Sequence, residues 1–130
     1  MTMPLVMTLA DWCILVAGLG VPFVFTIYAK ASKDFDNSKP RDYMERIEGA
    51  RKRAYWAVQN GQETFPLFAV AVLLAERAAV AQANVNMIAA GFVACRLVYG
   101  LMYVLDKATL RSVVWMASIA CIVTLFVMAA

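Results

Sequence analysis

Four long apolar stretches, separated by short polar segments, dominate the pattern of the chain. Each stretch is close to the roughly 20 residues that an α-helix needs to cross the hydrocarbon of a bilayer. Helices with short connections are the simplest way to satisfy every backbone group in lipid. We therefore predict an all-α membrane protein, a single domain over 1–130 folded as an antiparallel four-helix bundle, with helices over about 5–29, 40–76, 82–105 and 109–129.

The first two predicted helices carry residues that affect their shape. Gly18, Gly20 and Pro22 lie inside the first helix and favour close packing or a kink. Pro40 suits the first turn of the second helix, and beyond it only Gly49 discourages a helical backbone. We therefore predict that the second helix begins outside the bilayer and continues directly into it.

Charge is concentrated in one loop and sets the expected orientation. The segment 30–53 holds eight of the twelve basic residues, with five of the nine acidic residues interleaved among them. The interleaved acids argue against a nucleic-acid surface. By the positive-inside rule, the loop of about 30–52 and the one near Lys107 and Arg111 face the cytoplasm. Both termini are then non-cytoplasmic, in the plasma membrane if the protein is bacterial.

The residue inventory excludes two kinds of site. The chain is 63% hydrophobic and only 16% charged, which is unlike a soluble globular protein. It has no histidine, and Cys13, Cys95 and Cys121 lie in apolar stretches without a CxxC pair. A zinc site and a His-dependent triad are therefore excluded, no metal is expected, and the thiols are interpreted as small apolar side chains.

Two charged residues interrupt the apolar stretches. Glu63 lies between Ala54 and Ala75, and Arg96 lies in the next stretch along the chain. An ionised side chain at such depth is costly and marks a functional site with a partner nearby. Two adjacent antiparallel helices would place both charges at similar depth, so we predict that Glu63 and Arg96 are partners. Whether such a pair builds a site or only fixes helix register is left open.

Polar residues form one stripe on each of these two helices. Asn60, Glu63 and Thr64 share a face with Arg53, and Arg96, Tyr99 and Tyr103 share a face of the next helix. The tyrosines could also be interfacial anchors, and Trp56 and Trp115 are interpreted as packing or interface residues. The predicted pocket has a cationic mouth, suited to an anionic polar ligand, formed by Arg51, Lys52, Arg53 and Arg111.

These blocks resemble a known family. The run RAYWAVQNGQETFPLF at 53–68 resembles the signature of the MAPEG family, membrane-associated proteins in eicosanoid and glutathione metabolism. RLVY at 96–99 with Tyr103, followed by LRS at 110–112 before Trp115, is similar to the third and fourth helices of that family. The chain resembles a bacterial-type member of the family, similar to microsomal glutathione transferases.

The resemblance implies a homotrimer with glutathione bound between subunits near the cytoplasmic side. It implies that Asn60, Glu63, Arg96, Tyr99 and Tyr103 line that pocket. Arg111 is implied to stabilise the glutathione thiolate, because a guanidinium favours the charged form of a thiol. Together with Arg53 these are the predicted site residues, and the expected activity is that of a transferase or peroxidase toward apolar electrophiles.

Two further functions stay open. The first is non-catalytic lipid binding or scaffolding within the same family. It is favoured by Trp56, which stands where glutathione-using members carry an additional Arg, and Thr64 also replaces an aromatic residue common in the family. The second is a small proton-coupled exporter, which fits less well because Glu63 has a cationic neighbour and the first helix carries only Asp11.

Overall fold

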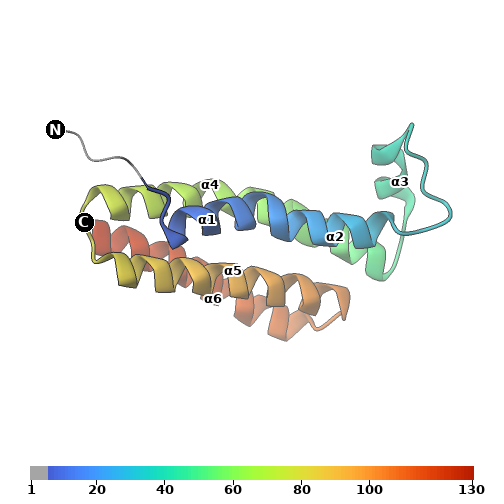
Figure 1. The fold of residues 1–130 in the computed structure, drawn as a ribbon. Coiled ribbons are helices and arrows are strands. Elements are labelled where there is room, and N and C mark those ends of the chain that lie inside the picture. Colours follow the sequence, from blue (N-terminus) through green and yellow to red (C-terminus); the bar gives the residue numbers. More distant parts are fainter. Residues whose placement is uncertain (1–5) are drawn as a thin grey trace.

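The computed structural model describes residues 6–130, and every regular element in this range is a helix. The elements are α1 (Leu9–Leu15), the π-helix η1 (Val16–Gly20), α2 (Val21–Lys30), α3 (Pro40–Arg46), α4 (Ala50–Arg77), α5 (Gln82–Val104) and α6 (Ala108–Ala129). α1, η1 and α2 follow one another without a break and form one rod, here called the first rod (Figure 1).

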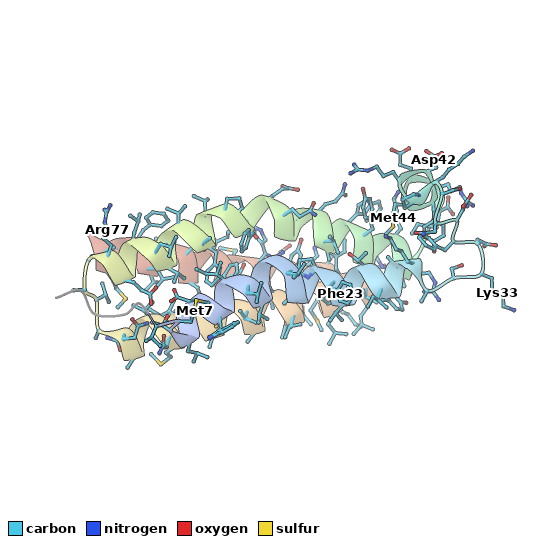
Figure 2. The ribbon with its side chains drawn as sticks, turned by 45° about the horizontal axis from the view of Figure 1, so that its top comes forward. Met7, Phe23, Lys33, Asp42, Met44 and Arg77 are labelled. Carbon is cyan, nitrogen blue, oxygen red and sulfur yellow. The ribbon has the colours of Figure 1, made fainter. Side chains whose placement is uncertain are left out.

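The first rod, α4, α5 and α6 lie side by side along most of their length (Figure 1). The first rod contacts α4 and α5, and α6 packs along the other side of the same two helices. Figure 2 shows the two ends of this arrangement, with Lys33, Asp42 and Met44 at one end and Arg77 at the other. We call these the loop end, which includes α3, and the opposite end.

The core lies between the helices and is narrow. Ala71, Ala75 and Ala89 are fully buried, and such small side chains let helix backbones approach closely. The rings of Phe68 on α4 and Phe92 on α5 stack with centroids 4.0 Å apart. Large apolar side chains elsewhere are exposed on all the long helices, which is the pattern of a surface that faces lipid or other chains.

The first rod begins at a well-formed cap and is irregular in its middle. Thr8 and Asp11 form a capping box at the start of α1. Residues 6–8 are not helical, so the predicted start at about residue 5 is wrong at positions 6–8, and position 5 lies outside the described residues. The π-helix occupies the segment with Gly18 and Gly20, two residues before Pro22, where the sequence predicts close packing or a kink.

The continuous helix predicted over 40–76 is wrong. Pro40 does begin a helix, but α3 ends at Arg46, and Ile47 has an extended backbone. Gly49 has φ +75° and ψ −148°, a conformation that residues with a Cβ rarely adopt, and α4 starts immediately after it. The chain turns there, so that Tyr43 and Met44 of α3 pack against Ala29 and Ala54.

Within the described range, three helical segments are long and apolar enough to cross a membrane: Leu9–Lys30, Gln82–Val104 and Ala108–Ala129. α4 is longer than any of them but is not one of the three. Its middle carries Gln59, Asn60, Gln62 and Glu63, which lower its hydropathy. The polar stripe therefore distinguishes α4 from the other long helices.

Candidate functional site

A polar cleft of about 280 Å³ lies on the side of the molecule where α4, α5 and α6 meet. Its lining comes from three helices: Asn60 from α4, Tyr99 and Tyr103 from α5, and Arg111, Ser112 and Trp115 from α6. Four of these are predicted site residues. Segments far apart in the sequence thus bring an amide, two phenols and a guanidinium to one place.

Arg96 lies behind the cleft and holds its amide in place. The Nη2 group of Arg96 donates a hydrogen bond of 2.8 Å to Oδ1 of Asn60. The guanidinium also lies against the ring of Tyr99, with Cζ 4.2 Å from the centroid. Because the amide oxygen of Asn60 is engaged, its NH2 group is left free to donate to a ligand.

The predicted pairing of Glu63 with Arg96 is wrong in this structure, since Asn60 is the partner and the Glu63 side chain is exposed. The reason is helix register. Arg53 bonds to the carbonyls of Tyr103 and Val104, whereas the predicted pairing requires it to lie level with Asp106. This shift of about one helical turn places Asn60 opposite Arg96.

The aromatic wall of the cleft positions Arg111, the one basic residue that lines it among residues 6–130. The rings of Tyr99 and Tyr103 meet edge to face with centroids 5.7 Å apart. Arg111, in the first turns of α6, places its Cζ 4.5 Å from the centroid of Tyr103. A cation over an aromatic face is attracted by the ring quadrupole, so Tyr103 fixes the guanidinium at the edge of the cleft.

The other three cations of the predicted mouth are used elsewhere in the part of the chain that the structure describes. They are consecutive in the first turn of α4, and each donates to the C-terminal carbonyls of a different helix: Arg51 to Tyr28 of α2 at 2.6 Å, Lys52 to Met44 of α3 at 2.6 Å, and Arg53 to Val104 of α5 at 3.0 Å. Basic side chains complement the orphan carbonyls and the negative dipole of a helix C-terminus. Arg53 is therefore a helix-capping residue that holds the end of α5 that carries Tyr103.

The sequence model of the MAPEG family matches residues 9–130, which include all the helices and every cleft residue. The chain belongs to the MAPEG family. Its membership and its apolar helices make it an integral membrane protein. It thereby falls in a family of membrane proteins related to glutathione or eicosanoid metabolism. Comparisons with curated proteins and with solved structures gave no match.

The sequence analysis did not predict two residues that line the polar cleft. Ser112 and Trp115 line it beside Arg111. The Nε1 atom of Trp115 is buried and has no hydrogen-bond partner among residues 6–130, although an indole N–H normally finds one. The available signal was spacing, because Arg111 and Trp115 lie four residues apart and therefore share a helix face.

Proposed function

We propose that this MAPEG protein is a membrane-bound glutathione transferase or peroxidase that binds glutathione in the cleft of α4, α5 and α6. The observation that carries the proposal is the convergence of Asn60, Tyr99, Tyr103 and Arg111 on one cleft. A free amide NH2, two phenol hydroxyls and a guanidinium form a donor-rich set. Such a set fits a ligand with carboxylates, peptide carbonyls and a thiol that reacts as the thiolate.

Each residue then has a distinct role. The NH2 group of Asn60, oriented by Arg96, donates to a carbonyl or carboxylate oxygen of the ligand. Arg111 lies where its charge favours the ionised form of a thiol in the cleft, which makes the sulfur nucleophilic without a protein base. The apolar electrophile approaches from the lipid, and large exposed apolar side chains cover the surface of α6.

The small volume of the cleft in one chain supports the proposal that several chains assemble to complete it. Its volume of about 280 Å³ is at the lower limit of ligand pockets, which typically measure about 300–1,000 Å³. We infer that neighbouring subunits of a homotrimer complete it. In that assembly α4 is the fourth membrane crossing of an antiparallel bundle. Its polar stripe, including the exposed Glu63, faces the ligand and the neighbouring chain, and both chain termini are non-cytoplasmic.

Glutathione binding to the detergent-solubilised protein tests the proposal. Calorimetry in buffers of different ionisation enthalpy reports binding and proton release together, and the ultraviolet absorbance reports the thiolate. We expect the wild type to bind glutathione, release protons at neutral pH and show the thiolate signal. Arg111→Ala should keep most of the binding and lose the proton release and the thiolate signal together.

Arg77→Ala is the matched control, because Arg77 is an exposed cation at the opposite end of the same helices. It should leave binding and thiolate formation unchanged. Raising the pH should partly restore the thiolate in Arg111→Ala, since the thiol then ionises unaided. Binding without a thiolate signal in the wild type would reject catalysis at this cleft.

A second candidate is non-catalytic lipid binding, which one observation favours. Arg111 is the only cation that lines the cleft among the residues described, since the capping interactions engage Arg51, Lys52 and Arg53. Trp56 is exposed nearby and its ring lies 6.3 Å from that of Tyr103, which adds apolar surface beside the cleft. Thermal stabilisation by fatty acids but not by glutathione would support this function.

A further inference from the structure

A second, smaller cavity lies inside the molecule, between the first rod, α4 and α5. Its volume is about 20 Å³, and its polar lining includes Arg96 and Thr64. The rings of Phe25 and Phe65 also line it, and a Cβ at Gly100 or Gly18 would overlap these rings. The two glycines therefore let the rings close over the cavity.

The π-helix leaves a carbonyl without its donor at this cavity. Val21 N–H bonds to the carbonyl of Val16, which is the π-helical pattern. In an α-helix, the Val21 N–H would donate to the carbonyl of Ala17. In a π-helix, the donor to the Ala17 carbonyl would be the N–H of residue 22. Residue 22 is proline and has no N–H. The carbonyl of Ala17, a residue that lines the cavity, thus lacks both its α-helical and its π-helical donor.

Arg96 carries a buried hydrogen-bond donor that has no acceptor among the described residues. Its side chain is 95% buried, given an exposed fraction of 5%. Nη2 donates to Asn60, but Nη1 is buried and has no hydrogen-bond partner in the part of the chain that is described. A buried unpaired donor costs about 1–3 kcal/mol, and more when it is charged, so Nη1 requires an acceptor.

We propose that this cavity binds one internal water molecule that joins the first rod to Arg96. A volume of about 20 Å³ holds one water, for which roughly 10–15 Å³ suffices, and is too small for an organic ligand. The water accepts from Nη1 of Arg96 and donates to the carbonyl of Ala17. Its second hydrogen goes to Oγ1 of Thr64, which keeps a free lone pair because it donates to the carbonyl of Gly61 at 3.2 Å.

The consequence of this water site is mechanical. The guanidinium of Arg96 is then held from two sides, by the water at Nη1 and by Asn60 at Nη2. Because Asn60 lines the polar cleft, the irregular segment of the first rod is connected to the cleft through three hydrogen-bonded steps. The first rod thereby takes part in orienting a cleft residue without lining the cleft itself.

An experimental structure at a resolution that shows ordered waters is the direct test. We expect a density peak about 2.7–3.2 Å from Nη1 of Arg96, the carbonyl of Ala17 and Oγ1 of Thr64. A cavity without density, in a map that shows waters elsewhere at similar depth, would reject the proposal. So would an Arg96 side chain whose Nη1 bonds directly to a protein acceptor.

Thermal unfolding in detergent gives an independent test through Thr64. Thr64→Val keeps the shape but removes the acceptor, and we expect its Tm to fall by about 2–8 °C. Thr64→Ser keeps the hydroxyl and should recover most of this loss. Thr124→Val is the matched control, because the Thr124 hydroxyl, like that of Thr64, donates to a carbonyl of its own helix, here that of Ala120. Equal losses at Thr64 and Thr124, or no recovery in Thr64→Ser, would overturn the water site.

Discussion

The two ends of the molecule are held together by opposite kinds of side chain. At the loop end, three basic residues of α4 donate to the C-terminal carbonyls of α2, α3 and α5. At the opposite end, side-chain acceptors meet the N-terminus of α1. Oγ1 of Thr8 accepts a hydrogen bond from the amide of Asp11, and Oδ1 of Asn86 accepts one of 3.1 Å from the amide of Ala10. Each end therefore carries groups that complement the helix termini that meet there.

This difference indicates that basic residues at the loop end stabilise the fold, in addition to their expected role in setting the orientation of the chain in the membrane. Arg51, Lys52 and Arg53 lie in the first turn of α4, where their charge opposes the dipole of their own helix. Their positions are explained by the other helices, whose ends they satisfy. Removing a cap at either end should lower stability, and the sizes of the losses test whether the comparison holds.

The largest loss is expected for Arg53→Met at the loop end. Arg53 is partly buried and makes three hydrogen bonds to the carbonyls of Tyr103 and Val104. Its loss removes the donor to the Val104 carbonyl, whereas the Tyr103 carbonyl keeps the amide of Asp106, and it frees the register of α4 against α5. We expect a loss of about 2–3 kcal/mol, measured by unfolding in mixed detergent and SDS.

Arg51→Met is the control for Arg53→Met, because Arg51 makes an exposed bond to a single carbonyl. It should cost less than about 1 kcal/mol. Equal losses for the two variants would mean that the total charge of the loop, and not the capping of α5, determines stability.

An intermediate loss is expected for Thr8→Val at the opposite end. Thr8 caps α1 and also donates from Oγ1 to Oε2 of Glu76 at 2.7 Å, which ties α1 to the end of α4. We expect a loss of about 1–2 kcal/mol in the same unfolding assay. Thr8→Ser keeps both bonds and should stay near wild type, so a Ser variant as unstable as Val would show that the methyl group matters instead.

The smallest effect, with the opposite sign, is expected for Glu76→Gln. Asp11 and Glu76 both accept hydrogen bonds from Thr8, and their carboxylates interact, so that two ionised groups here would repel each other. An amide at position 76 can still accept from Thr8, and its NH2 can donate to Asp11. We expect a gain of up to about 0.5 kcal/mol at neutral pH. A clear loss would mean that the carboxylate itself is required at this end.

The sequence predicted elements better than it predicted contacts between them. The helix predicted over 82–105 is observed as Gln82–Val104, and that over 109–129 as Ala108–Ala129, because polar residues bound the first stretch on both sides and the second at its start. The break at Gly49 was missed because a single glycine in a polar segment is compatible with a helix or a turn. In the fold, the turn at Gly49 allows Tyr43 to pack against Ala29, where the Tyr43 hydroxyl donates a hydrogen bond of 2.7 Å to the Ala29 carbonyl. Such a tertiary contact cannot be seen in the sequence.

The candidate site shows the same limit. Helical spacing correctly grouped Tyr99 with Tyr103, since that grouping depends only on one helix, but of the stripe predicted on α4 only Asn60 lines the cleft. The partner of Arg96 depends on the relative height of two helices, which the ends of apolar stretches fix only to within about a turn. The acceptors of Arg51 and Arg53 could not be predicted either. These long side chains bind carbonyls at the ends of other helices, and only the fold determines where those ends lie.

The π-helix also fixes the rotational phase of the first rod. A short π segment is equivalent to one residue inserted in an α-helix, and one residue turns a helix by about 100°. Deleting one residue between Val16 and Gly20 would straighten the rod but rotate everything after it. Phe25 would leave the surface of Gly100, and Ala29 would turn away from the hydroxyl of Tyr43. The inserted residue thus allows one continuous helix to present two differently oriented faces, one on each half, to the same neighbours.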